Sequence, residues 1–545
     1  MPHFLEYLLP ALNKYSSRTL LKLFTGTPGA PSWKSVTYQM FIDDLERVAA
    51  HWIEPLKEAG LQPQDVIGLW ITGEKYTDLI HLYALARIGY VPQMLNKAMA
   101  TLHDAVPSVL SMTQGKAILY DPFFSSAIAS LPYKCIALVN DLNLLPLLGD
   151  RKLPAIPDVP DDALGVIFHT SGTTGGRPKP VPETHKWLRC QAQVQWPAIW
   201  QGGDDVQGVV NNLGSFANVG SATTVSYLGW SGQCLVQTSK PDIDANEFMA
   251  LIAEAGMNWA FLYAPWLSKL INIAKTDEKV LAALKGLVEV TYTGAALNPS
   301  DEAWLVENGV KATAMYATTE SGCCLVSDVN NTAALPSMHI IKGINVKLIP
   351  ATSSKKEVLD GDAASRLQGG KLFDLFVPAD APNCPHPTIR NRPDGHITGD
   401  LFEETAPGMY AFRGRNDDWI RTGKHYSFCD TKSIEDNILH VCSDLVGNCV
   451  VAGHYKPGIV LFVEPLFVDP SDNDAVVILK EQILERHAPF NTNAFIHERL
   501  QSKLQIVVVH RGTLPRTTEK GNIRRKAAED EHAEILDTIY AQLKV

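Results

Sequence analysis

The segment FHTSGTTGGRPKPV, residues 168–181, carries several groups suited to binding phosphate. Its hydroxyl side chains alternate with glycines that let the backbone approach a ligand closely, and Lys179 adds a positive charge. No Gly-Lys-Ser/Thr sequence closes the segment, so it differs from a P-loop. The sequence predicts a phosphate-binding loop formed by Thr170, Ser171, Gly172, Thr173, Thr174, Gly175 and Lys179.

Four further short motifs follow this segment along the chain. They are residues 293–297 (TGAAL), 316–320 (YATTE), 398–400 (TGD) and 414–418 (GRNDD). Together with the phosphate-binding segment, they resemble, in the same order, the motifs of the adenylate-forming superfamily. That superfamily includes acyl-CoA synthetases, luciferases and the adenylation domains of peptide synthetases. Each motif taken singly could be a structural feature, but five in register are not expected by chance.

The resemblance implies attack of a carboxylate on the α-phosphorus of ATP, with loss of pyrophosphate. In this reaction Tyr316 would stack on adenine, Glu320 would hold Mg2+ against the phosphate oxygens, and Thr319 would donate to the α-phosphate. Asp400 would accept both ribose hydroxyls, and Arg415 would contact the ribose side. The turn on the adenine side would contain Gly294, Ala295 and Ala296. ATP and Mg2+ are therefore the expected cofactors.

A basic segment near the C-terminus, LPRTTEKGNIRR, resembles the loop that carries the catalytic lysine of this superfamily. The usual order in that loop is Gly-Lys, whereas here Lys520 precedes Gly521 and Asn522 stands in the usual lysine position. This order, together with HTSGTTG and PKP, is most similar to the adenylation domains of fungal adenylate-forming reductases, the NRPS-like carboxylic acid reductases. Lys520 is accordingly the expected catalytic lysine, the alternatives being a neighbouring residue in that role or a solvated loop lysine at position 520.

The expected acid pocket is recognised by what it lacks. In relatives that activate amino acids, the stretch corresponding to residues 216–220 carries an Asp that pairs with the substrate ammonium, and here Ala217 stands there. A buried ammonium without a carboxylate is costly, so the pocket favours an aryl or other non-α-amino acid. The same correspondence predicts a lining of Phe216, Ala217, Asn218, Ser221, Tyr263, Thr291, Thr293, Met315 and Cys323, some of which could simply pack the core.

The elements that must position these residues follow an α/β pattern. A helical pattern over residues 37–60 precedes an apolar run at 66–71, and strand-like runs such as NWAFLYAP, VEVTYTG and VKATAMYA recur farther along the chain. Strands separated by helices imply parallel sheets, whose carboxyl edge is where ligands bind. The predicted fold is α/β, with a large N-terminal adenylate-forming domain of parallel-rich sheets flanked by helices and a small mobile α+β C-terminal domain.

The domain boundary is expected where charges and glycines gather after Met409. The predicted domains are residues 1–413, an adenylation core that binds ATP and the acid, and residues 421–545, a C-terminal domain that carries the lysine loop. Residues 414–420 would form a hinge at Asp417. Two arrangements of the C-terminal domain would then serve the two half-reactions.

Composition narrows the function classes. The 545 residues carry a formal charge of -11, which argues against a nucleic-acid partner. The nine cysteines have no zinc-site spacing, and no apolar run is long enough to span a bilayer, so a cytoplasmic protein without a membrane partner is expected.

The predicted function is ATP-dependent activation of a carboxylic acid to acyl-AMP, followed by transfer to the phosphopantetheine thiol of a carrier protein. One alternative is a self-contained acyl-CoA ligase. Another is a nucleotide- or acyl-binding protein that has lost catalysis, because Ala317 replaces a usual glycine and the lysine is displaced.

Overall fold

The computed structural model divides the chain into two compact units. The first contains residues 1–172, 177–347 and 376–397, and the second contains residues 173–176, 348–375 and 398–545. The structure describes residues 3–27, 29–102, 104–149, 153–170, 178–200, 206–240, 242–297, 299–329, 337–351, 372–415, 420–423, 427–494, 496–516 and 523–543. The predicted hinge at residues 414–420 stays a prediction, and Asp417 lies outside the described residues.

One sheet of the first unit is six-stranded among the described residues, in the order β6-β5-β3-β4-β7-β8. Its strands are β3 (Val66–Trp70), β4 (Val91–Leu95), β5 (Ala117–Tyr120), β6 (Lys134–Ala137), β7 (Leu164–Thr170) and β8 (Lys179–Thr184). All neighbours pair in parallel except β7 and β8, which are antiparallel. Pro180 and Pro182 lack N–H donors and lie at alternate positions of β8, which suits an edge strand.

A second set of strands in the first unit follows the order β15-β14-β13-β12-β11-β9-β10-β1-β2. The bounds are β1 (Thr19–Phe24), β2 (Trp33–Thr37), β9 (Val209–Asn211), β10 (Cys234–Val236), β11 (Trp259–Tyr263), β12 (Glu289–Thr293), β13 (Ala312–Thr318), β14 (Gly322–Ser327) and β15 (Met338–Ile340). From β1 through β13 in this order the neighbours are parallel, so the carboxyl ends of β11, β12 and β13 share one edge. The apolar runs that predicted these three strands are confirmed.

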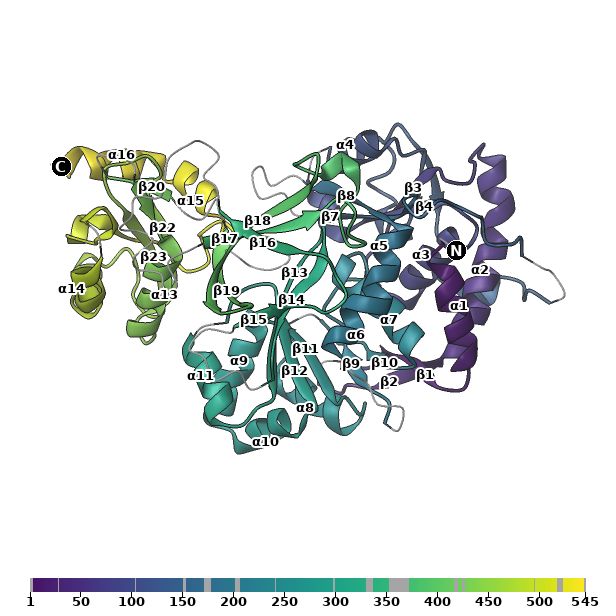
Figure 1. The fold of residues 1–545 in the computed structure, drawn as a ribbon, viewed down its shortest axis with the longest axis horizontal. Helices are drawn as coiled ribbons and strands as arrows, with labels where there is room; N and C mark the ends of the chain where they lie inside the picture. Colours follow the sequence, from purple (N-terminus) through teal and green to yellow (C-terminus); the bar gives the residue numbers. More distant parts are fainter. Residues whose placement is uncertain are drawn as a thin grey trace. The chain divides into compact units, whose positions relative to one another are not determined.

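Helices and short turns complete the first unit; α9 packs beside β11 and β12, and α10 and α11 contact α9 (Figure 1). The helices are α1 (Leu5–Lys14), α2 (Tyr38–Glu58), α3 (Tyr76–Arg87), α4 (Ala105–Thr113), α5 (His185–Cys190), α6 (Trp196–Ile199), α7 (Val219–Ser231), α8 (Ala245–Ala253), α9 (Ala264–Ala274), α10 (Glu278–Gly286) and α11 (Pro299–Glu307). The shorter turns are η1 (Lys97–Thr101), η2 (Pro122–Phe124), η3 (Leu142–Leu144), η4 (Gln191–Gln195) and η5 (Pro387–Ile389). The segment η4 is a π-helix continuous with α5 and α6.

The second unit contains a three-stranded sheet that is buried on both faces. The elements that lie wholly or partly in this unit are β16 (Lys347–Pro350), β17 (Leu372–Pro378), β18 (Gly395–Ala406), β19 (Met409–Arg415), β20 (Ile420–Thr422), β21 (Ser427–Cys429), β22 (Val446–Ala452), β23 (Val460–Pro465), β24 (Ile506–Val508), α13 (Thr431–Val441), α14 (Asn473–Asn493), α15 (Arg525–Glu531), α16 (Ala533–Gln542), η6 (Ile496–Glu498) and η7 (Lys503–Gln505). In the sheet β22-β23-β24, Leu461 packs in a core with residues of α13 and α14, and Phe462 packs in another with residues of α15 and α16. Successive side chains of a strand point to opposite faces, so one apolar run supplies both cores.

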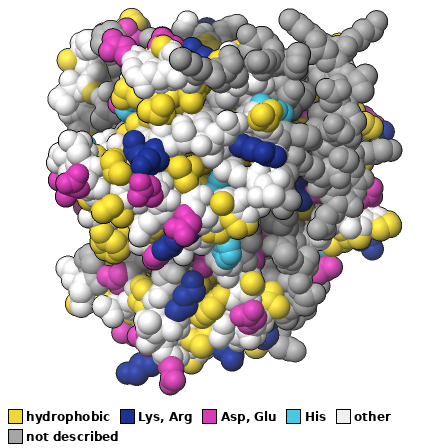
Figure 2. All heavy atoms as spheres, turned by 90° about the vertical axis from the view of Figure 1, so that its left-hand side faces the viewer, with side chains coloured by type: hydrophobic (Ala, Val, Ile, Leu, Met, Phe, Trp, Pro, Cys, Tyr) yellow, Lys and Arg dark blue, Asp and Glu magenta, His cyan; other side chains and the backbone are white. Residues whose placement is uncertain are grey.

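The predicted fold class is confirmed, since a large unit of parallel-rich strands and helices is accompanied by a smaller α+β unit. On the face drawn in Figure 2, basic and acidic side chains lie beside one another. Within the part of the chain that the structure covers, no helix combines the length and hydropathy needed to cross a bilayer.

Candidate functional site

The two strands that flank the predicted phosphate-binding loop form a hairpin. Thr170, at the end of β7, pairs in register with Lys179, at the start of β8. Thr170 is half-buried and Lys179 is exposed. The predicted loop residues Ser171, Gly172, Thr173, Thr174 and Gly175 lie outside the described residues.

His169, the β7 residue before Thr170, has a neutral side chain that connects the hairpin to β4 by hydrogen bonds. Its Nδ1 lies 2.9 Å from the Met94 carbonyl oxygen, and its Nε2 lies 3.0 Å from Gln93 Nε2. Nδ1 therefore carries the proton and Nε2 accepts from the amide. Burial lowers the pKa of His169 to about 4, so the imidazole adds no charge next to the loop at neutral pH.

The carboxyl ends of β11, β12 and β13 bring four predicted residues together. Tyr263 pairs in register with Thr293, and the Thr293 hydroxyl donates to the Met315 carbonyl at 2.9 Å. Gly294 follows with φ +85°, and a Cβ there would lie 2.6 Å from the Tyr263 ring. Only glycine fits this close approach, which leaves the Tyr263 ring against the backbone of the turn. Ala295 and Ala296 continue the turn and are half-buried.

Thr291 lies two residues before this edge and is fully buried. Its hydroxyl accepts from Trp200 Nε1 at 3.0 Å and donates to Glu289 Oε1 at 3.1 Å. Trp200 and Trp196 stack with ring centroids 4.7 Å apart, and both rings meet Phe261 edge-on. Thr291 thus belongs to an aromatic cluster, and its predicted contact with substrate stays a prediction.

The loop before α7 carries the residues expected to face the acid. The Phe216 amide donates to the Gly73 carbonyl at 2.8 Å, and the Ala217 amide donates to Ser215 Oγ at 3.2 Å. Phe216 and Ala217 are buried, Ser221 is buried with its hydroxyl on the Gly214 carbonyl, and Asn218 caps α7 half-buried. The loop is therefore held by the Gly73 carbonyl and by the hydroxyls of Ser215 and Ser221, and it carries a methyl group at position 217.

The predicted catalytic residues Thr319 and Glu320 lie in residues 318–323, which we name the acidic turn, between β13 and β14. The antiparallel pairing shifts register after Tyr316, and the Ser321 amide donates to Thr318 Oγ1 at 3.0 Å. Tyr316, Thr319 and Glu320 are half-buried, and Cys323 is buried. The acidic turn thus follows directly from the edge at which Tyr263, Thr293 and Met315 meet.

A buried carboxyl that the sequence did not single out lies near Glu320. Glu183 of β8 is fully buried, and neither oxygen has a hydrogen-bond partner among the described residues. Burial, followed by the nearby charge of Glu320, holds the pKa of Glu183 well above its ordinary value. His396 also feels the Glu320 charge, although burial lowers its pKa overall. A Glu within the apolar run PVPET was the signal available in the sequence.

In the second unit, the structure brings two predicted ribose ligands together. Asp400 of β18 pairs in register with Arg415 of β19, and Arg415 Nη1 lies 3.8 Å from Asp400 Oδ1. Asp400 is buried, whereas Arg415 is partly exposed. Lys520 lies outside the described residues.

Residues 512–516, at the start of the lysine segment, are held by a side chain that sequence reasoning missed. Glu464 of β23 is fully buried and accepts from the amides of Gly512 (3.0 Å) and Leu514 (2.9 Å) and from Arg516 Nη1 (3.1 Å) and Nη2 (2.5 Å). Asn448 Nδ2 donates to the same carboxylate at 3.1 Å. We call Glu464 and Arg516 the carboxylate anchor.

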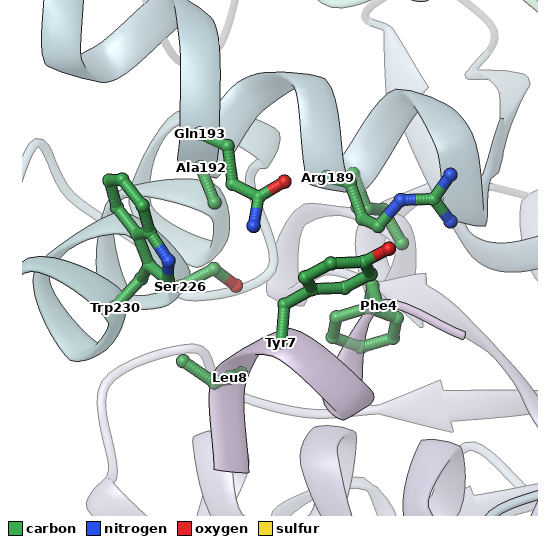
Figure 3. Close-up of a pocket in the computed structure, with 9 residues that line it drawn as sticks. Phe4, Tyr7, Leu8, Arg189, Ala192, Gln193, Ser226 and Trp230 are labelled. Atoms are coloured by element: carbon green, nitrogen blue, oxygen red, sulfur yellow. The ribbon is translucent and has the colours of Figure 1, made fainter. Parts of the chain in front are cut away.

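A shallow hollow in the first unit involves none of the predicted site residues. It lies between α1 and the helices α5, η4 and α7 (Figure 3). Its lining consists of Phe4, Tyr7, Leu8, Leu188, Arg189, Ala192, Gln193, Ser226 and Trp230.

Comparison with known families places this geometry in context. Residues 12–360 match the family described as AMP-binding enzyme, and residues 429–544 match the AMP-binding enzyme C-terminal domain. The chain belongs to the AMP-binding enzyme family. The expected membership of the adenylate-forming superfamily is confirmed, and enzymes of this family use ATP.

Two fungal relatives are similar over most of the chain. The AMP-binding domain-containing enzyme iboA of Amanita muscaria (strain Koide BX008) is 34% identical over 507 residues, which cover 91% of this chain and 95% of that protein. The adenylate-forming reductase stbB of Stachybotrys bisbyi is 24% identical over 479 residues, covering 85% of this chain but only 42% of the reductase. The expected likeness to adenylate-forming reductases is confirmed.

Solved structures of family members share the fold. ATP-bound MatB from Rhodopseudomonas palustris superposes with a TM-score of 0.75 at 17% identity, covering 97% of this chain and 99% of that one. McyG A-PCP complexed with phenylalanyl-adenylate gives a TM-score of 0.73 at 14% identity, covering 99% and 84%. At these identities the likeness establishes the fold alone.

Proposed function

We propose that this adenylate-forming enzyme activates a carboxylic acid, of aryl or other non-α-amino type, and passes the acyl group to a carrier-protein phosphopantetheine thiol. The observation that carries the proposal is the edge of β11, β12 and β13, where Tyr263, Thr293 and Met315 meet and lead into the acidic turn. Ligands of open α/β sheets bind at this edge.

The phosphate side of the proposed site is the β7–β8 hairpin. Thr170 and Lys179 flank the loop, and we propose that Ser171, Gly172, Thr173, Thr174 and Gly175 donate to the phosphate oxygens. The imidazole of His169, in the strand next to Thr170, is neutral at neutral pH and adds no charge beside the phosphate-binding loop.

On the nucleotide side, Tyr316 is proposed to stack on adenine, with Gly294, Ala295 and Ala296 forming the turn beside it. Thr319 would donate to the α-phosphate, where charge grows in the transition state. From the second unit, Asp400 would accept the ribose hydroxyls and Arg415 would bind beside them.

The acidic turn fits Mg2+ chemistry. Among the described residues no three His, Cys, Asp or Glu side chains are arranged as a complete metal site. Mg2+ prefers one or two carboxylates together with substrate phosphates and water, and the half-buried Glu320 offers one such carboxylate. When bound there, Mg2+ would neutralise charge on the phosphate oxygens.

The proposed acid pocket is neutral. The lining would comprise Phe216, Ala217, Asn218, Ser221, Tyr263, Thr291, Thr293, Met315 and Cys323. A methyl group at the buried position 217 cannot pair with an ammonium, so α-amino acids are disfavoured there.

The chemistry is two displacements. A carboxylate oxygen of the acid attacks the α-phosphorus, the bond from that phosphorus to the bridging oxygen of pyrophosphate breaks, and acyl-AMP remains. The thiol, losing its proton, then attacks the acyl carbon and AMP leaves. Lys520 would stabilise the departing pyrophosphate, and Asp417 would be the hinge that exchanges the two arrangements.

The test is acid-dependent exchange of labelled pyrophosphate into ATP, screened over aryl, aliphatic and α-amino acids. We expect exchange with a non-α-amino acid, and loss of that exchange in Glu320→Ala with the fold intact. A proteinogenic amino acid as the best substrate would overturn the pocket assignment. ATP binding without exchange for any acid would favour a binding protein that has lost catalysis.

The thiol acceptor is tested separately, by offering the acyl-adenylate a phosphopantetheine-loaded carrier protein or free CoA. Faster thioester formation on the carrier supports the proposal, and faster formation on CoA makes the protein an acyl-CoA ligase. The name of McyG A-PCP, which includes a carrier domain, supports the carrier, because this chain shares the fold of that protein.

A further inference from the structure

One helical segment holds the backbone of the acidic turn. Trp187 Nε1 donates to the Glu320 carbonyl at 3.2 Å. Gln195 Nε2 donates to the Ser321 carbonyl at 3.0 Å and to the Cys323 carbonyl at 2.6 Å. Both carbonyls held by Gln195 therefore lie within three residues of Glu320.

A second glutamine orients the first. Gln191 Nε2 donates to Gln195 Oε1, so the oxygen of the Gln195 amide is engaged and its nitrogen faces the acidic turn. Gln191 is 2% exposed and Gln195 is fully buried. Because both amides are shielded from water, their geometry is set by these hydrogen bonds. We call Gln191 and Gln195 the glutamine clamp.

The π-helix explains how these side chains reach one turn. Trp187, Gln191 and Gln195 are spaced by four residues, and in an α-helix each such step rotates the side chain by about 40° around the axis. The wider turn of a π-helix over Gln191–Gln195 counteracts that rotation, so Gln195 stays on the face used by Trp187. Short π-helical segments of this kind often occur at functional sites.

Packing against the acidic turn is also tight. Gly322 has φ +67°, and a Cβ at this position would lie 2.0 Å from Gln191 Nε2. The absence of a side chain at Gly322 therefore lets the glutamine clamp approach the backbone. The acidic turn has little room to shift while the clamp is in place.

We propose that Gln195, oriented by Gln191, is a positioning residue for Thr319 and Glu320 in adenylation. This inference rests on the proposed roles of those two residues. The clamp binds the carbonyls of Ser321 and Cys323 and thereby fixes the orientation of the Glu320 side chain. A small displacement of a ligand-binding group is enough to slow catalysis strongly.

The decisive variant is Gln195→Met, which keeps the length of the side chain and removes its donors. We expect pyrophosphate exchange to slow by about tenfold or more at saturating acid, with the KM for the acid nearly unchanged. A second readout is the ATP dissociation constant, measured by calorimetry with Mg2+ and with EDTA. The ratio of the ATP dissociation constant in EDTA to that in Mg2+ should fall severalfold in Gln195→Met.

The matched control is Gln193→Met on the same π-helix. Its side chain lines the hollow between α1 and α7 (Figure 3), and it should leave exchange and the Mg2+ effect unchanged. Tyr227→Phe controls for lost stability, because it removes one buried hydrogen bond, to the Trp200 carbonyl, on the neighbouring helix α7.

The outcomes separate the inference from the proposed function. Normal exchange and a normal Mg2+ effect in Gln195→Met overturn the inference. Tyr227→Phe also overturns it if its melting temperature equals that of Gln195→Met and it loses as much of the exchange rate and of the Mg2+ effect. Wild-type exchange in Glu320→Ala overturns the proposed role of Glu320 itself, whatever Gln195→Met does.

Discussion

The acidic turn of the first unit and residues 512–516 of the second are both held by a buried polar side chain, of opposite chemistry. Gln195 is a neutral donor that binds two backbone carbonyls. Glu464 is an acceptor that binds two backbone amides and the Arg516 guanidinium. The polarity of the backbone groups limits the choice of side chain, since a carbonyl requires a hydrogen-bond donor and an amide requires an acceptor.

The difference has an energetic consequence. The carboxylate anchor joins a buried charge to a cationic partner, so removing Glu464 leaves the Arg516 guanidinium without its carboxylate and two backbone amides unpaired. The glutamine clamp carries no charge, so its loss leaves only unpaired carbonyls. We therefore expect the anchor to contribute mainly to stability and the clamp mainly to catalysis.

The largest expected effect is the loss of the anchor. Glu464→Ala should lower the free energy of unfolding of the second unit by about 3 to 5 kcal/mol, because the Arg516 charge is left partly buried without its partner. Urea unfolding followed by circular dichroism measures this loss. Glu464→Gln, which retains the shape and one acceptor, is the control and should lose less.

The next effect concerns the segment that follows the anchor. Lys520→Ala should slow acyl-AMP formation by more than about tenfold, whereas thioester formation from supplied acyl-AMP should be nearly unaffected. Single-turnover measurement of each half-reaction tests this, and Asp417→Pro should show the reverse pattern if it traps the adenylating arrangement. Full adenylation in Lys520→Ala, with loss in Asn522→Ala, would reassign the lysine loop.

Acidic pH should reduce the stabilising contribution of the carboxylate anchor but not that of the glutamine clamp. Burial opposes ionisation of Glu464, but hydrogen bonds from Arg516 and Leu514 hold its pKa below the ordinary 4.5. Because the folded-state pKa is the lower one, the carboxylate's contribution is complete above pH 4.5 and is lost as pH falls through the folded-state pKa.

The stability difference between wild type and Glu464→Gln should therefore shrink below pH 4.5, as measured by urea unfolding from pH 7 downward. The difference between wild type and Gln195→Met should stay constant over the same range, because an amide does not titrate. If the stability difference between wild type and Gln195→Met changed with pH, this contrast would be contradicted.

A smaller effect than the loss of the anchor is expected at Gly322. Gly322→Ala should cost about 2 to 3 kcal/mol of stability, because its positive φ disfavours a side chain and the new methyl overlaps the buried Gln191 amide. A double-mutant cycle with Gln191→Ala separates the two causes. Removing Gln191 should relieve the contact and leave the backbone cost, and strict additivity would show that the contact is unimportant.

Sequence patterns predicted the strands that form the site edge. Residues 259–263, 289–293 and 312–318 are short apolar runs, and such runs form buried parallel strands wherever they are flanked by helices. The motifs also singled out Tyr316, Glu320 and Asp400, which lie in β13, in the acidic turn and in β18, because a motif places residue types at fixed spacing. The loop residues 171–175 and Lys520 lie outside the described residues, so their predicted roles are still to be tested.

By itself the sequence determined the family, the positions along the chain of the apolar runs that form strands, and the residue types of the phosphate-binding segment. Tertiary structure alone decided that Gln195 binds carbonyls 126 and 128 residues away, and that Glu464 binds amides 48 and 50 residues away. It also decided that Glu183 lies buried near Glu320. The physical reason is that local propensity depends on neighbours along the chain, whereas a buried hydrogen bond depends on which distant backbone group packing leaves without water.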